Sequence, residues 1–359
     1  MKTIKIRTAR GSYNIHAGRG ILKHFKPLVA KAGLPRRAVI VTTSPILRLL
    51  RKKIENALRG FDTLYLLIPD TEKSKNADLA LRLIEKITPF DRGKDIFLAA
   101  LGGGVAGDLT GFMAAIYKRG VPYLQIPTSL LAQIDSSIGG KTAVDTRFGK
   151  NLIGAFYPPR FVLIDTRLLS TLPKKELISG LSEGVKYGLI SDPLLFRWIQ
   201  QNVGRLLKAD PAALEHLVQR CAAIKAGIVS RDEFDKKDIR IVLNFGHTIG
   251  HAVEAASGFA LPHGPSIAIG MVCACELSER LGGLKKGTTR HVIALLEDIG
   301  LPTKIPARIM ASSLKALTHD KKFKAGKNRF VLLQRIGRTR IVENIPEGVI
   351  RDVLKSRLA

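Results

Sequence analysis

The sequence predicts an α/β domain with a parallel sheet in the N-terminal half, followed by a mostly helical domain. Two patterns indicate this division. In the first half, short buried apolar runs alternate with amphipathic stretches of helical spacing. After about Pro173, clear strands give way to helical periodicity that continues to about Leu301. We expect the boundary near residues 171–173, with domains at 1–172 and 173–359.

The elements of the first half are expected in a regular order. Thr3–Arg7 and Tyr13–His16 flank a Gly-Ser pair and predict a hairpin. Because strands that alternate with helices form parallel sheets with right-handed crossovers, we expect a parallel sheet after this hairpin. The expected strands are at 38–42, 63–68 and 95–101, and the expected helices are at 45–58 and 76–87.

The C-terminal half contains one distinctly apolar run and, within 320–340, one or two short strand-like runs. Ile267–Cys275 predicts a buried helix, because it is far shorter than the ~20 residues that a membrane span needs. Phe330–Gln334 is one such strand-like run. We expect no membrane partner.

The cysteines and the N-terminal residues indicate the cellular compartment. The chain has three cysteines in 359 residues, too few for a disulfide framework, so we expect buried, reduced thiols and a cytoplasmic protein. The N-terminus has no continuous apolar region, which disfavours a signal peptide.

The net charge is strongly positive. Lys and Arg number 58 and Asp and Glu 30, which gives +28. Such an excess favours anionic partners. However, the basic residues are spread along the chain, with no basic helix, zinc-finger spacing or aromatic RNA-binding motif. We therefore expect a solvated basic surface and no nucleic-acid partner.

A glycine-rich turn follows the third buried strand. The run DIFLAALGGGVAGD extends from Asp95 to Asp108. Glycines let backbone N–H groups approach a pyrophosphate, and a following helix N-terminus favours its negative charge. The strict GxGxxG pattern is absent, so a tight structural turn remains the alternative interpretation.

A polar, lysine-bearing segment extends from Arg119 to Asn151. Thr128 and Ser129 come just after an apolar run, and Asp135 and two lysines follow. Lysines beside glycine turns can reach phosphate or carboxylate groups as point charges. A series of surface turns is the alternative for this segment.

The helical half contains a candidate metal site. His247 and His251 lie at i and i+4 and therefore share one helix face, with His263 nearby. Together with the carboxylate of Glu183, they have the ligand types of a catalytic zinc site. There is no HExxH, which disfavours a zinc protease. Spacing alone does not say which histidines bind the metal.

At these residues the chain resembles the 3-dehydroquinate synthase family. The similarity extends from about Val41 to about Phe330. The motifs that carry it are GGGVAGDLTGF, RGVPYLQIPTSLLAQIDSSIGGKTAVD, GKNLIGAFYPP, SGLSEGVKYG, RIVLNFGHTIGHA, LPHGPSIAIGM and DKK.

The resemblance implies a dehydroquinate synthase-like fold, with a Rossmann-like parallel sheet in its N-terminal domain and a helical metal-binding domain. It also implies a lyase of the shikimate pathway that converts 3-deoxy-D-arabino-heptulosonate 7-phosphate to 3-dehydroquinate and phosphate. The steps are transient oxidation by NAD, phosphate elimination, re-reduction and aldol closure. The implied cofactors are NAD and a divalent metal, zinc or else cobalt, and the implied assembly is a homodimer.

The resemblance further implies roles for individual residues. The metal ligands are Glu183, His247 and His263. The NAD contacts are Glu72, Lys73, Ser74, Lys75, Gly103, Gly104, Val105, Asp108, Thr128, Ser129 and Lys150. The substrate contacts are Arg119 (in the neighbouring subunit's site), Asp135, Lys141, Asn151, Lys186, Lys225, Arg240, Asn244 and Lys322. The residues implied in catalysis are His251, Lys141, Lys186 and Asp235.

Three positions depart from the family pattern. Thr43 stands where the family often has an acidic residue, and Pro265 stands where it often has glutamate. Asp235 falls near the family's second acid/base glutamate, with one extra residue between Glu233 and Arg240. The alternatives are a cyclase for another sugar phosphate and a polyol dehydrogenase, which would release NADH stoichiometrically.

Overall fold

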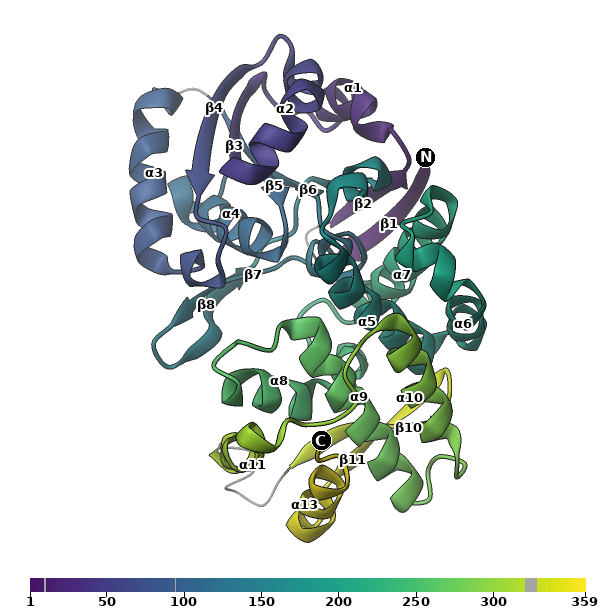
Figure 1. The fold of residues 1–359 in the computed structure, drawn as a ribbon. Coiled ribbons are helices and arrows are strands. Elements are labelled where there is room, and N and C mark those ends of the chain that lie inside the picture. The colour runs from purple at the N-terminus through teal and green to yellow at the C-terminus, as the bar shows by residue number, and fades with distance from the viewer. Residues whose placement is uncertain (10, 94, 320–327) are drawn as a thin grey trace. The chain divides into compact units, whose positions relative to one another are not determined.

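The computed structural model describes residues 1–9, 11–93, 95–319 and 328–359, with the side chains of 318 and 319 left aside. The chain forms two compact units, shown in Figure 1. One contains Met1–Pro173 and Pro211–Phe234, and the other contains Lys174–Asp210 and Asp235–Ala359. The expected division into domains at 1–172 and 173–359 stays a prediction. In the structure, the segment 211–234 packs with the first unit, although it follows the expected boundary in the sequence.

The first unit is built on a seven-stranded sheet of order β1-β2-β9-β6-β5-β3-β4. The hairpin at its edge is antiparallel, as expected, and every other pairing in the sheet is parallel. The strands are β1 (Lys2–Thr8), β2 (Gly11–Gly18), β3 (Arg37–Thr43), β4 (Asp62–Ile68), β5 (Phe97–Gly102), β6 (Tyr123–Pro127) and β9 (Phe161–Asp165).

Helices cover both faces of this sheet because its central strands are apolar on both sides. On β3, Ile40 packs with the α1 and α2 side, whereas Val39 and Val41 pack with α3 and α4. Such fully buried strands are typical of parallel sheets. The helices are α1 (Phe25–Lys31), α2 (Ser44–Leu58), α3 (Ala77–Asp91) and α4 (Gly104–Ile116).

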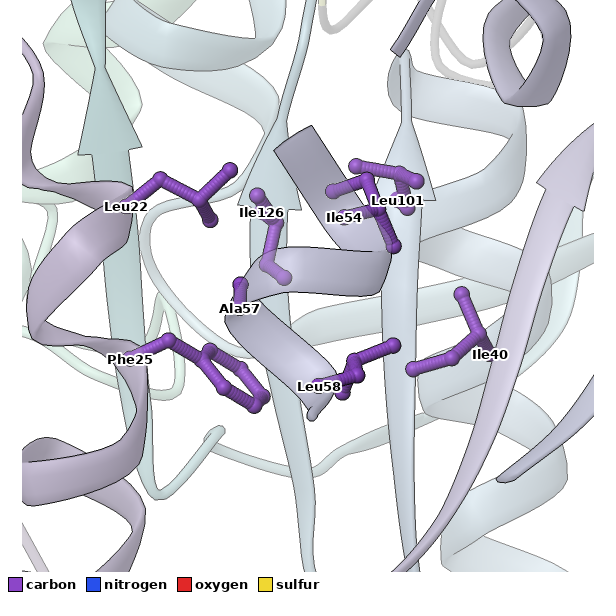
Figure 2. A pocket seen from close by; sticks show the side chains of 8 residues that line it. All are labelled: Leu22, Phe25, Ile40, Ile54, Ala57, Leu58, Leu101 and Ile126. Carbon is purple, nitrogen blue, oxygen red and sulfur yellow. The ribbon is translucent and has the colours of Figure 1, made fainter. Parts of the chain in front are cut away.

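A small apolar cavity of about 10 Å³ lies in the core on the α1 and α2 side. Figure 2 shows the aliphatic side chains and the Phe25 ring that line it. The lining contains no polar residue, so this cavity belongs to the core and carries no chemistry.

Short elements connect the strands and support the site. The helical turns are η1 (Ile21–His24), η2 (Glu72–Ser74), η3 (Tyr117–Arg119), the π-helix η4 (Ala132–Ser136) and η5 (Thr166–Thr171). A separate antiparallel hairpin, β7 (Lys141–Thr146) and β8 (Gly149–Phe156), lies in the polar segment. The interpretation of that segment as a series of surface turns was therefore wrong for its second half.

Helix α7 (Pro211–Arg231) completes the first unit. It packs against β1 and β2, and the Arg7 N–H donates to Ser230 Oγ at 3.1 Å. The helix thus lies against the edge hairpin.

The second unit is mostly helical, as expected, and ends with a small hairpin. Its helices are α5 (Lys174–Ser191), α6 (Pro193–Leu207), η6 (Arg240–Asn244), α8 (His247–Ala256), α9 (His263–Arg280), α10 (Thr288–Ile299), η7 (Ala307–Ile309), α11 (Met310–His319) and α13 (Glu347–Ser356). Its strands β10 (Arg329–Arg335) and β11 (Arg338–Glu343) pair in antiparallel fashion. Over the described residues, no helix is both long and apolar enough to cross a bilayer.

Candidate active site

Glycines bring three helices of the second unit unusually close together. A Cβ at Gly264, in the first turn of α9, would lie 2.2 Å from the Ser179 carbonyl oxygen of α5. A Cβ at Gly270 would lie 2.0 Å from the Gly246 carbonyl oxygen, just before α8. Real Cβ atoms do not approach so closely, so only glycine fits at these crossings. The consequence is that side chains of α5, α8 and α9 can meet.

Glu183, His247 and His263 meet at this crossing. Glu183 Oε1 lies 3.5 Å from His247 Nε2 and 3.4 Å from His263 Nε2. One ligand atom of each side chain falls within 4.8 Å of the other two. Two imidazoles and one carboxylate are the donor set of many catalytic zinc sites. The residues present therefore fit a divalent metal such as zinc.

The surroundings of His247 favour its neutral, ligating form. His247 Nδ1 lies 3.1 Å from the Phe245 carbonyl oxygen. Because a carbonyl only accepts, Nδ1 carries the hydrogen and Nε2 keeps the lone pair that faces Glu183. Burial, followed by the nearby charge of Lys186, holds the pKa of His247 well below its ordinary value.

Two further residues expected at the site lie beside these three. Lys186 Nζ contacts Glu183 Oε2, and both side chains are buried. The His251 ring centroid lies 5.1 Å from that of His247. His251 also forms a second possible cluster with His263 and Glu254. Sequence reasoning missed Glu254, although its position three residues after His251 puts it on the same helix face.

In the first unit, the glycine turn lies at the carboxyl ends of two neighbouring strands. β5 ends at Gly102, and the Thr128 N–H after β6 donates to the Gly102 carbonyl at 2.9 Å. A Cβ on Gly103 would lie 3.6 Å from Ser129 Oγ. The N-terminus of α4 begins here, and such a terminus attracts phosphate through its N–H groups.

Lys75 joins residues that sequence reasoning had assigned to different ligands. Its ammonium group lies 2.5 Å from Asp108 Oδ2 and also donates to Asn151 Oδ1. Asp145 fixes the backbones of both Lys75 and Asn151. Its N–H donates to the Lys75 carbonyl at 2.7 Å, and its Oδ1 accepts from the Asn151 N–H at 2.8 Å. Sequence reasoning missed Asp145, which no motif distinguishes from a surface residue of the polar segment.

Burial makes the Lys75–Asp108 pair interdependent. Burial raises the pKa of Asp108 above its ordinary value, although Lys75 opposes the shift. Burial disfavours the ammonium form of Lys75, but Asp108 outweighs it and raises the pKa of Lys75. Each charge therefore depends on the other in this position.

A second buried lysine is fixed by the π-helix η4 of the same unit. Lys225 of α7 lies 2.8 Å from Asp135 Oδ1 and also donates to the Asp135 carbonyl at 2.8 Å. Lys150 lies 3.4 Å from Glu72 Oε1. Lys141 is exposed, with its ammonium group 5.9 Å from the centroid of the Phe156 ring.

The remaining expected residues are placed less distinctively. Arg240 is buried in η6, and Asn244 is exposed at its end. Arg119 and Asp235 have left-handed backbones, with φ of 62° and 58°. Lys322 lies outside the described residues. The structure places the expected metal ligands beside Lys186 and His251 in one unit. In the other unit, Lys75, one of the residues expected at NAD, contacts both Asp108 and Asn151.

Comparison with known proteins gives a consistent family. Residues 65–179 match the family model described as 3-dehydroquinate synthase N-terminal, and residues 180–323 match the one described as 3-dehydroquinate synthase C-terminal. A 3-dehydroquinate synthase of Methylococcus capsulatus is 43% identical over 358 residues, which cover 99% of each chain.

Two solved structures are similar over nearly the whole chain. A 2-deoxy-scyllo-inosose synthase complexed with carbaglucose-6-phosphate, NAD⁺ and Co²⁺ gives a TM-score of 0.89 at 26% identity, covering 99% of this chain and 100% of that one. The 2-epi-5-epi-valiolone synthase of Streptomyces hygroscopicus, with NAD⁺ and Zn²⁺ bound, gives 0.85 at 26% identity over 96% of each chain.

Proposed function

This chain belongs to the 3-dehydroquinate synthase family, and on that premise we propose how its own residues carry out the family's reaction. The chain is an enzyme that forms 3-dehydroquinate in the shikimate pathway. Its substrate is 3-deoxy-D-arabino-heptulosonate 7-phosphate, and phosphate is the second product. The observation that carries the assignment is the meeting of Glu183, His247 and His263 in a chain that matches these synthases from end to end.

We assign the metal to these three side chains and take zinc as the ion, with cobalt as a substitute. The donor set supports this choice, and two structural neighbours hold Zn²⁺ or Co²⁺ together with NAD⁺. When bound, the metal supplies Lewis acidity at a substrate hydroxyl, and NAD accepts a hydride and later returns it.

The residues proposed to hold NAD surround the glycine turn of the first unit. The N-terminus of α4 offers backbone N–H groups to the pyrophosphate. The pair of Lys75 and Asp108 holds the segment before α3 against α4. The remaining members are Glu72, Lys73, Ser74, Gly103, Gly104, Val105, Thr128, Ser129 and Lys150.

The residues proposed to bind the anionic substrate are mainly cations. A buried arginine such as Arg240 can hold a carboxylate or phosphate in bidentate fashion, and lysines add point charges. The contact with Asp135 fixes Lys225 in one rotamer, which lowers the entropic cost of binding. The other members are Lys141, Asn151, Lys186, Asn244 and Lys322, together with Arg119 of a neighbouring copy.

Proton transfer is proposed for His251, with Asp235 as its partner acid or base. An imidazole titrates near neutrality, which suits it to move protons between substrate oxygens and carbons. His251 is exposed and lies beside the partly buried His247, which supports a role at the substrate rather than at the metal. Lys186 would hold the Glu183 carboxylate in its ligating orientation.

We propose a cytoplasmic homodimer. The three cysteines are free and buried, and burial raises the pKa of the Cys273 thiol to about 12. Such thiols are inert and fit a reducing compartment. The dimer rests on the role given to Arg119, and light scattering of the purified protein at micromolar concentration tests it directly.

Phosphate release tests the proposed function. The protein would be given the heptulosonate phosphate with catalytic NAD and zinc, before and after chelation. We expect release with no net NADH, loss of release with chelator and recovery with zinc. No release, together with NADH accumulation from a polyol, would contradict the assignment and indicate a dehydrogenase. Release only from another sugar phosphate would indicate a different cyclase.

A further inference from the structure

A basic hollow lies on the α1 and α2 side of the first unit's sheet. Lys23 of η1, Lys26 of α1, Lys53 of α2 and Arg167 of η5 line it, and its volume is about 400 Å³. An adjoining hollow of about 320 Å³ shares two of these cations and adds Arg19. All five side chains belong to exposed residues. A hollow of this size can hold a ligand of several hundred daltons.

The charge of these cations is not neutralised by the protein. In the part of the chain that the structure describes, none of the five side chains forms an ion pair. The single acid in the lining, Asp165, is only 2% exposed. Its carboxylate accepts from the N–H groups of Gly20 at 2.7 Å, Leu22 at 2.9 Å and Arg167 at 3.0 Å. The acid is therefore used to fix the loop around Gly20, and the hollow keeps a positive potential that attracts anions.

Part of the lining of the hollow is apolar. Leu22 and Ala57 contribute to it and are buried, whereas the basic residues are exposed. The same two side chains also line the small core cavity, where Figure 2 shows them with Phe25. The hollow thus combines buried apolar side chains with exposed cations. A ligand that matches it carries several negative charges on an apolar body.

We propose that this hollow binds an organic polyphosphate of the nucleoside triphosphate class. Phosphate oxygens match both the planar guanidinium of Arg167 and the point charges of the lysines. A base or similar ring would cover Leu22 and Ala57. None of the residues proposed for NAD, metal or sugar phosphate lines this hollow, so it is a separate site.

Calorimetric titration tests the site. Adenosine triphosphate without magnesium would be titrated at low salt into zinc-loaded protein saturated with NAD, which would occupy the proposed dinucleotide site. The variant Lys23→Ala/Lys53→Ala should raise the Kd about tenfold, because two exposed charge contacts together contribute roughly 1.4 kcal/mol. The control Lys285→Ala/Lys286→Ala removes the same net charge from exposed positions in the second unit and should leave the Kd unchanged within about twofold.

The outcomes separate the proposal from its rivals. Equal weakening in both double variants would show an effect of overall charge, and no weakening in either would place the ligand elsewhere; both results overturn the site. Inorganic triphosphate should bind more weakly than the nucleotide, and adenosine should not bind. Equal affinity for inorganic triphosphate would overturn the organic part of the proposal. Phosphate release from the sugar phosphate and the melting temperature should match the parent protein in both variants, which verifies their folding.

Discussion

At the scale of single residues, His247 is the most direct test of the metal assignment. Its Nε2 faces Glu183 with a free lone pair, because its Nδ1 donates to the Phe245 carbonyl. Changes to groups that merely orient a ligand cost 10–100-fold in metal affinity, so His247→Ala should cost at least about 100-fold. Zinc content by mass spectrometry and phosphate release should fall together. The control is His291→Ala on the exposed surface of α10. Full zinc content in His247→Ala would refute the assignment.

Lys75 provides a test of electrostatics in the first unit. Lys75→Met leaves the partly buried Asp108 carboxylate without its cation, which should cost about 3 kcal/mol at neutral pH. The loss should depend on pH. Removal of Lys75 raises the pKa of folded Asp108 further above its unfolded value. Such a group destabilises the fold as pH rises through the interval between the two values. The deficit should therefore be small in acid and full at neutral pH.

Urea unfolding of Lys75→Met across this pH range measures the effect. The double variant Lys75→Met/Asp108→Asn is the control, because without the carboxylate the added pH dependence should disappear. A deficit of the same size at acid and neutral pH would mean that the lysine contributes through packing alone, as long stems can.

Residue-level reasoning from the sequence had clear limits. The spacing of His247, His251 and His263 indicated a metal site but left the ligand set open, and the fold still offers two overlapping clusters. The contact of Lys75 with both Asp108 and Asn151 was not predictable, because one ammonium group joins three segments that are far apart in the sequence, with Lys75 and Asn151 separated by 76 positions. Local patterns carry no information on such pairings.

At the scale of elements, the crossing of α5, α8 and α9 depends on glycine. Gly264→Ala would place a Cβ 2.2 Å from the Ser179 carbonyl oxygen, so α9 must move away from α5. Because His263 begins α9, we expect this variant to lose stability by about 1–3 kcal/mol and to lose zinc affinity as well. Gly204→Ala is the matched control in α6, where a Cβ meets nothing within 4 Å.

The control should behave in the opposite way. Alanine is favoured over glycine within a helix by about 1 kcal/mol, so Gly204→Ala should raise the melting temperature slightly. Thermal unfolding and zinc titration of the two variants measure both effects. Unchanged zinc affinity in Gly264→Ala would show that the helix crossing is not what positions His263.

The elements themselves were predictable to different degrees. Strands β3, β4 and β5 were predictable because they are apolar on both sides and are separated by amphipathic helices. The hairpin of β7 and β8 was not. On β8, Leu152 and Ile153 are both exposed, so the strand has no alternation of buried and exposed residues to reveal it.

At the scale of the whole molecule, the net charge of +28 should influence stability. Like charges repel one another more in the compact state than in the expanded chain, so folding is opposed at low salt. Raising NaCl from about 0.01 M to about 0.15 M shortens the screening length from ~30 Å to ~8 Å. We therefore expect the melting temperature to rise with NaCl over this range. Chloride is the proper anion for this test, because sulfate resembles phosphate and could bind in the basic hollow.

The effect of NaCl on the melting temperature depends on two kinds of charge interaction. Several carboxylates are already paired, as with Asp238 and Arg329 at 2.7 Å, and salt weakens such surface pairs. The two effects oppose each other, so the sign of the change decides which is larger. With 58 basic residues against 30 acidic ones, repulsion should prevail. A melting temperature that falls with NaCl would mean that local pairs outweigh the net charge. In that case, ion pairs between neighbouring acidic and basic side chains would contribute more to the stability of the fold than the screening of repulsion by counterions.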